Sequence, residues 1–204
     1  NPLFYFHVPG KDIHTLCEVT GKPGLNIEMR DDISVTAGPL THDGNSDYAM
    51  KLNGTKGYSV SNVYPVCQMD TGDYTAAGWV RFDKIQKQII WSNRVLGNAA
   101  TAEEREKGAY YRVLWLTEEG RLEHTAYFPE KDAASRKVKP VSSSVSLEPN
   151  KWYFVAVTHA LKKPKLLYIN GELAAQSAES QAVLLEKYSD LSFGQPFEGL
   201  APGL

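Results

Sequence analysis

A run of oxygen-bearing side chains is the first candidate for chemistry in this chain. Asp43, Asn45 and Asp47 stand at alternate positions, as the first three ligands of an EF-hand calcium loop do, and hard oxygen donors at that spacing can converge on one ion. The pattern then fails, because Tyr48 stands where the loop requires glycine and Gly54 where it requires a bidentate glutamate. The full pattern therefore favours an Asx-rich turn over a calcium loop.

A second group of side chains combines aromatic rings with charges. Residues 110–116 and 121–128 flank the turn Thr117-Glu-Glu-Gly120 and predict a β-hairpin. If a four-residue turn sets the register, Leu116 faces Arg121. One face of the hairpin then carries the candidate ligand-binding residues Tyr110, Arg112, Glu123 and Tyr127, with Leu114 and Leu116 beside them.

Such a face suits sugars, which present apolar C–H faces and hydroxyl edges to aromatic platforms and fixed polar groups. The alternative is an ordinary exposed sheet with a surface salt bridge and an aromatic cross-strand pair. Trp91 is a further candidate ligand-binding residue, although its strand also suits the core. The opposite face is predicted to be core: Tyr111, Val113, Trp115, Leu122, His124, Ala126 and Phe128.

The strand signals are strongest near the C-terminal end. Residues 152–159 are rich in aromatic and β-branched side chains, and 165–169 predict a second strand. Asn170 and Gly171 tolerate positive φ, which predicts a tight hairpin leading to residues 172–178. His124 and His159 fall on such strands and are predicted to be packed rather than catalytic.

Four stretches, in order, resemble laminin-G-like domains of the concanavalin A-like jelly-roll class. They are Lys51-Leu-Asn-Gly-Thr-Lys-Gly-Tyr58, Asp73-Tyr-Thr-Ala-Ala-Gly-Trp-Val-Arg81, the Trp-Tyr-Phe-Val-Ala-Val strand with Leu-Tyr-Ile-Asn-Gly171, and Phe193-Gly194 with Phe197-Glu-Gly199. The resemblance spans about residues 40–199. Residues 74–82 predict a strand on which Trp79 is core. The resemblance itself implies an all-β fold, a sandwich of two antiparallel sheets. It also implies that Asp43 or Asp47 could join a structural calcium site.

We expect one domain over residues 1–204, with 1–30 as an N-terminal arm and edge strand. Thr101 and Glu104 form a capping box, so a short surface helix is predicted near 101–107. Lysines near an edge strand predicted at 138–143 suit protection of that edge and an anionic ligand equally well. The chain begins with Asn1 rather than Met, which predicts a processed or truncated start.

The motifs of related enzymes are missing from the sequence. Jelly-roll glucanases use Glu-x-Asp-x-x-Glu on one strand, and the nearest stretch, Glu130 to Ser135, lacks the last carboxylate. The Arg-rich strand and Gln-x-His motif of jelly-roll lyases are also absent. We therefore predict a non-catalytic module that binds a glycan or an extracellular protein. The alternatives are a structural or accessory domain of a carbohydrate-active enzyme and, less favoured, a glycoside hydrolase or lyase.

Composition and cysteine usage bear on the compartment. A net charge of −2 and a pI near 6.2 argue against nucleic acid or an anionic membrane as partner, and no apolar run reaches the ~18 residues of a membrane span. Cys17 and Cys67 form either a disulfide in a secreted domain or two buried free thiols. Asn53 begins the only glycosylation sequon. Together these features predict a secreted, cell-surface or periplasmic domain.

Overall fold

The computed structural model describes nine segments of the chain: residues 26–28, 34–42, 45–52, 58–61, 74–95, 110–126, 140–160, 163–179 and 189–194. All regular structure in these segments is β-strand, which confirms the all-β prediction. The helix predicted near 101–107, the edge strand near 3–8, Cys17, Cys67 and Asn53 lie outside them, so these remain predictions. The same segments contain no helix long and apolar enough to cross a membrane.

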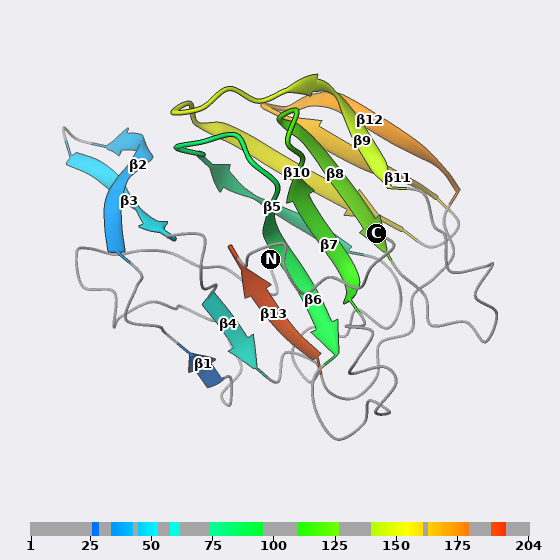
Figure 1. The fold of residues 1–204 in the computed structure, drawn as a ribbon, viewed down its shortest axis with the longest axis horizontal. Helices are drawn as coiled ribbons and strands as arrows, with labels where there is room; N and C mark the ends of the chain where they lie inside the picture. The colour runs from blue at the N-terminus through cyan, green and yellow to red at the C-terminus, as the bar shows by residue number, and fades with distance from the viewer. Residues whose placement is uncertain are drawn as a thin grey trace.

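Thirteen strands make up three antiparallel sheets (Figure 1). In chain order they are β1 (Asn26–Glu28), β2 (Ser34–His42), β3 (Asn45–Lys51), β4 (Tyr58–Ser61), β5 (Tyr74–Val80), β6 (Gln88–Val95), β7 (Tyr110–Leu116), β8 (Arg121–Ala126), β9 (Val141–Ser146), β10 (Tyr153–His159), β11 (Pro164–Ile169), β12 (Glu172–Glu179) and β13 (Ser189–Phe193).

The two larger sheets form the layers of a sandwich. The seven-stranded sheet has the order β1-β4-β13-β6-β7-β8-β9, and the four-stranded sheet has the order β12-β11-β10-β5. β2 and β3 form a separate hairpin beside them (Figure 1). β9 is the last strand of its sheet, as the lysine-bearing edge strand was predicted to be, although it begins at Val141.

The core lies between the two layers and follows the alternation of each strand. On β10 every second residue from Tyr153 to His159 is buried, and on β11 Lys165, Leu167 and Ile169 are buried. Trp91 lies in this core, as its strand pattern suggested. The buried cluster comprises Phe82, Trp91, Leu114, Leu116, Leu122, Val141, Leu147, Tyr153, Val155, Val157, Leu167 and Ile169.

Two glycine-bearing turns show how local chemistry sets the register. Asn170 and Gly171 have φ of 53° and 87°, so the predicted tight β11–β12 hairpin is confirmed. At the end of β13, Gly194 has a φ of 63°, and an added Cβ would overlap the side chain of Leu52. Only glycine fits there without displacing that contact.

The predicted register of the β7–β8 hairpin is wrong by one residue. Gly120, with a φ of 79°, takes the left-handed position of a three-residue turn, so Thr117 bonds to Arg121 and Leu116 pairs with Leu122. The one-residue slip exchanges the faces of β7 relative to β8. Leu114 and Leu116 therefore join Leu122 in the core, where Val113 and Trp115 had been expected.

Val113 and Trp115 are nevertheless buried, on the other face of the seven-stranded sheet. They form a separate apolar cluster with Ile89, which pairs with Trp115 across β6 and β7. Buried Ser92 faces Val113 in the same register. Around β6 and β7, both faces of this sheet are thus closed to solvent.

Candidate binding face

The outer face of the four-stranded sheet is open, and its side chains form rows across the strands. One row is mostly polar and contains Thr75, Thr158, Leu166 and Gln176. The next contains Ala77, Ala156, Tyr168 and Leu173. Trp79 pairs with Phe154 in the third row. Trp79 was predicted to be core, but it alternates outward with Thr75 and is 42% exposed.

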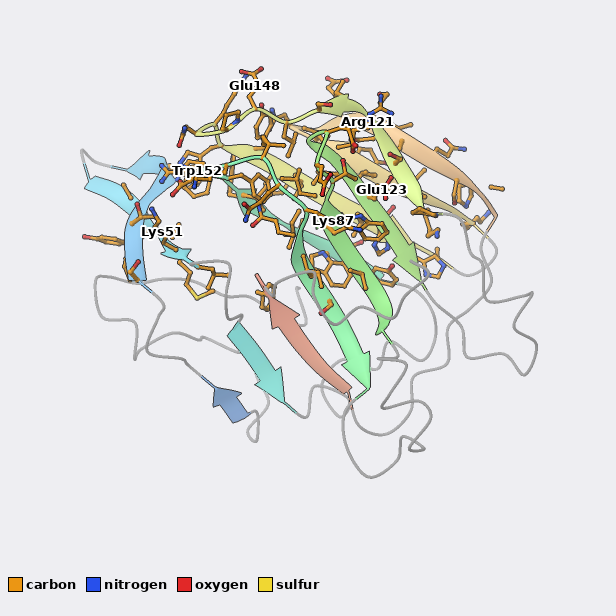
Figure 2. The ribbon with its side chains drawn as sticks, viewed as in Figure 1. Lys51, Lys87, Arg121, Glu123, Glu148 and Trp152 are labelled. Atoms are coloured by element: carbon orange, nitrogen blue, oxygen red, sulfur yellow. The ribbon has the colours of Figure 1, made fainter. Side chains whose placement is uncertain are left out.

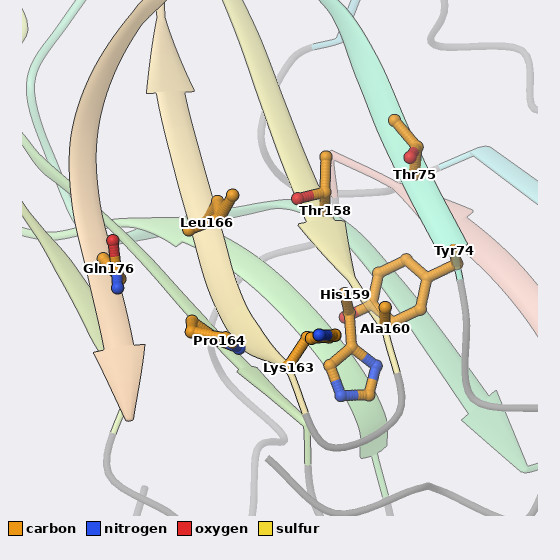
Figure 3. A pocket seen from close by; sticks show the side chains of 9 residues that line it. All are labelled: Tyr74, Thr75, Thr158, His159, Ala160, Lys163, Pro164, Leu166 and Gln176. Carbon is orange, nitrogen blue, oxygen red and sulfur yellow. The ribbon is translucent and has the colours of Figure 1, made fainter. Parts of the chain in front are cut away.

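A hollow of about 740 Å³ lies where the polar row meets the ends of β5, β10 and β11. Figure 3 shows its lining, in which Tyr74 and His159 lie together at the ends of β5 and β10. Their ring centroids are 5.2 Å apart. The lining also carries hydroxyl, amide and ammonium groups, of which Thr75, Thr158 and Gln176 lie on the outer side of the sheet. The described lining is Tyr74, Thr75, Thr158, His159, Ala160, Lys163, Pro164, Leu166 and Gln176.

The ring of Tyr74 is held in place by a hydrogen-bond network that joins the two layers. Nδ1 of buried His124 lies 2.8 Å from the carbonyl oxygen of Val113. Because a carbonyl oxygen only accepts, Nδ1 carries the proton, and Nε2 of the neutral ring accepts from the Tyr74 hydroxyl, 2.5 Å away. Trp91 packs edge-on against Tyr74, with ring centroids 6.3 Å apart. One wall of the hollow is therefore preorganised.

A buried lysine lies on the inner face of the strand that borders the hollow. The side chain of Lys165 is only 2% exposed, and its Nζ has no hydrogen-bond partner within the described part of the chain. Its backbone N–H donates to Ser177 Oγ at 2.9 Å. Burial lowers the pKa of the Lys165 ammonium from 10.5 to about 8, because desolvation penalises the charged form. This residue weakens the core near neutral pH.

The opposite end of the outer face is aromatic and cationic. The rings of Trp79 and Phe154 meet edge to face, with centroids 5.4 Å apart. At the next outward-facing positions beyond Trp79 and Phe154, the Arg81 guanidinium lies 5.2 Å from the centroid of the Trp152 ring. Figure 2 labels Trp152, which directly precedes β10.

An ion pair fixes the loop beyond Arg81. Asp83 accepts from Lys51 Nζ at 2.7 Å and lies 3.9 Å from the Arg81 guanidinium. The hydrogen bond from Lys51 is the main cause that holds the pKa of Asp83 below its ordinary value. The β2–β3 hairpin is thereby linked to the chain segment that follows β5.

The structure separates Arg112 from Glu123, two candidate ligand-binding residues that the predicted register had placed on one face. Arg112 pairs with Ala126, two positions from the core residue Leu114, whereas Glu123 pairs with Trp115. By register, Arg112 and Glu123 therefore occupy opposite faces of the sheet. Tyr110 and Arg112 lie on β7 with side chains outside the description, and Tyr127 lies outside the described residues altogether. Their ligand-binding role stays a prediction.

The predicted metal ligands are only partly described. Asn45 and Asp47 lie on β3, and Asp43 lies outside the described segments. His42 on β2 pairs with Asn45 on β3, so Asn45 and Asp47 belong to a paired strand. Among the described residues, no group of three or more His, Cys, Asp or Glu side chains could hold a metal ion. A calcium site involving Asp43 or Asp47 stays a prediction.

Sequence reasoning missed the outer-face residues because both faces of β5 and β10 carry apolar side chains. The available signal was the two-residue period of Thr75, Ala77, Trp79 and Arg81, which places Trp79 with polar and small residues rather than with Tyr74 and Val80. On β10, Phe154 and Thr158 share the same side.

A family model described as the concanavalin A-like lectin/glucanases superfamily matches residues 43–202. No curated protein matches the chain. Among solved structures, domain 4 of an extracellular arabinanase from Geobacillus stearothermophilus, in complex with arabinotriose, is similar with a TM-score of 0.54 and 13% identity. The match covers 84% of this chain and 73% of that one.

Two further structures are similar over most of this chain. The botulinum neurotoxin serotype D binding domain matches with a TM-score of 0.57 and 19% identity, over 90% of this chain and 41% of that one. A Trypanosoma rangeli sialidase in complex with 2,3-difluorosialic acid matches with a TM-score of 0.53 and 14% identity, over 96% of this chain and 31% of that one. The chain thus spans less than half of either. At these identities the likeness shows the fold alone.

Proposed function

Because the chain belongs to the concanavalin A-like lectin/glucanases superfamily, we propose that it is a non-catalytic carbohydrate-binding module that holds its ligand in the hollow at the end of β5 and β10. The fold hosts many functions, so the proposal depends on the site rather than on the family. The observation that carries it is the lining on the outer side of the sheet, where the apolar side chain of Leu166 stands between the hydrogen-bonding side chains of Thr158 and Gln176.

The chemistry of that lining matches a sugar ring. The apolar C–H face of a sugar can pack on Leu166, which lies between Thr158 and Gln176 in the polar row of the outer face. Sugar hydroxyls can exchange hydrogen bonds with Thr75, Thr158 and Gln176. Lys163 adds an ammonium donor to the same lining. Preorganised groups of this kind favour affinity because little conformational freedom is lost on binding.

A glycan array with purified protein tests this proposal, with arabinotriose included as a soluble probe. We expect specific binding that Gln176→Ala weakens about five- to tenfold, since one charge-neutral hydrogen-bonding side chain contributes on the order of 1 kcal/mol. Gln86→Ala, at another exposed position, is the matched control and should leave binding unchanged. A blank array, or equal binding by both variants, would contradict a glycan site in the hollow.

We place the module in a secreted or surface-exposed protein, as one domain of a larger chain such as a carbohydrate-active enzyme. Two of the similar structures are domains of larger proteins, an arabinanase and a neurotoxin, which supports this proposal. A Cys17–Cys67 disulfide and a calcium site near Asp43 belong to the same proposal. Mass spectrometry with and without reductant tests the disulfide, and thermal unfolding with Ca²⁺ or EDTA tests the metal site.

Recognition of an extracellular protein is the second candidate function. Trp79, which is 42% exposed and packs against Phe154 on the outer face, favours it, because exposed aromatic side chains are enriched at protein interfaces. Binding to a protein ligand that is abolished by Trp79→Ala and unaffected by Gln176→Ala would support this alternative over glycan binding.

A further inference from the structure

We propose that the ligand is an extended glycan chain, which runs along β10 from the hollow to the aromatic end of the same face, rather than a single terminal sugar. This inference rests on the proposed function. It adds a second contact zone, formed by Trp79, Phe154, Trp152 and Arg81 and called the aromatic zone below.

The hollow and the aromatic zone lie on one side of one sheet. Thr158 borders the hollow, and Phe154 in the aromatic zone is four residues away on the same strand. At ~3.4 Å per residue, the two positions are about 14 Å apart. A single sugar ring in the hollow cannot contact both zones, whereas a chain of several rings can.

The surface between the two zones has a low floor. Ala77 and Ala156 pair directly with each other there, and neither side chain extends beyond Cβ. Tyr168 pairs with Ala156 from the other side, and Leu173, 52% exposed, lies beyond it on β12. At these two positions no long side chain therefore stands on the path from the hollow to the aromatic zone.

The aromatic zone offers the groups that a further part of a sugar chain needs. Trp79 is 42% exposed and its ring is supported at its edge by Phe154. Aromatic rings of this size attract the C–H faces of sugars. The Arg81 guanidinium, stacked on Trp152, keeps several N–H donors in a fixed plane next to them. The aromatic zone thus adds a ring to pack on and a fixed donor to the hydrogen-bonding side chains that line the hollow.

The decisive experiment measures affinity against chain length. Wild-type protein is titrated with arabinan, xylan, cellulose and chitin oligosaccharides of one to eight units, and with the matching polymers by affinity electrophoresis. We expect affinity to rise with length until both zones are reached. Trp79→Ala should weaken binding of the long chains about tenfold, as truncation of an aromatic anchor does, and leave short chains unaffected. Gln176→Ala should weaken both.

Two controls keep the result interpretable. Trp79→Phe retains an aromatic ring and should recover most of the long-chain affinity, while Val145→Ala, an exposed apolar position on β9, should have no effect. Thermal unfolding of each variant verifies that the fold is retained.

The failure of this inference can be told apart from the failure of the proposed function. Affinity that does not depend on length, or long chains that bind Trp79→Ala as tightly as wild type, would overturn the extended-chain inference and leave the glycan site intact. No binding to any of the ladders, together with a blank array, would overturn both.

Discussion

The outer faces of the two sheets differ in how far solvent reaches them. On the seven-stranded sheet, Ile89, Val113 and Trp115 are buried on the side that points away from the core. On the four-stranded sheet, Trp79 and Leu173 are largely exposed on the corresponding side. The comparison teaches that a tryptophan on an outer face can serve stability in one layer and remain available to a ligand in the other.

The two outer-face tryptophans provide the test with the largest expected effect. Trp115→Ala should lower the free energy of unfolding by about 3–5 kcal/mol, because it empties a buried site. Trp79→Ala should lower it by only about 1 kcal/mol, the contribution of an edge-to-face contact with Phe154. Urea unfolding followed by circular dichroism measures both. Equal losses would remove the distinction between the faces.

Two lysines near the start of β11, buried Lys165 and exposed Lys163, extend the comparison to single buried and exposed side chains. The pKa of buried Lys165 is about 8, below the 10.5 of the unfolded chain, so the unfolded state binds more protons between these values. The free energy of unfolding should therefore rise as pH increases from 8 to 10.5, by roughly 3 kcal/mol.

Lys165→Met should remove this pH dependence and raise stability near pH 7 by a similar amount, roughly 3 kcal/mol, as an upper limit. Lys163→Met, at an exposed position of the hollow, is the matched control and should keep the wild-type profile. A flat wild-type profile between pH 8 and 10.5 would show that the Lys165 ammonium is solvated.

Tyrosines on the two sides of the four-stranded sheet should respond differently to loss of the hydroxyl. Tyr74→Phe leaves Nε2 of buried His124 without its donor and should cost about 1–3 kcal/mol. Tyr168→Phe, on the open outer face, should change stability by no more than about 0.5 kcal/mol. Similar small effects for both in thermal unfolding would argue against the cross-layer network.

The smallest effect is expected for the ion pair at the margin of the outer face. Lys51→Ala should lower the free energy of unfolding by less than about 1 kcal/mol, since both partners are about half exposed. Added salt should reduce the difference from wild type. Lys151→Ala, whose pair with Glu148 is longer at 3.5 Å, should have a smaller effect still.

Local sequence signals predicted the elements well, and long-range packing decided what they missed. The Asn170-Gly171 hairpin follows from two residues that accept positive φ, so neighbours in sequence suffice to predict it. The β7–β8 register depended on whether Thr117 or Leu116 closed the turn. The left-handed Gly120 decided that question in favour of Thr117.

The candidate site was less predictable because the two-residue period does not identify which side of a strand is buried. Trp79 and Phe154 are as apolar as the core residues with which they alternate. The second sheet packs on Tyr153 and Val155, and this packing determines which side of β10 faces inward. The hollow likewise depends on Thr75, Thr158 and Gln176, which three different strands place in one row of the outer face.

The contact between β9 and β12 has a consequence for self-association. Ser144 on β9 donates to the carbonyl oxygen of Ala174 on β12 at 3.1 Å, where the end strands of the two layers come together (Figure 1). An end strand whose hydrogen-bonding groups meet a neighbour offers a poorer template for a strand from another molecule. At this margin of the sandwich, the carbonyl oxygen of Ala174 is therefore already engaged and is less available to a strand from another molecule.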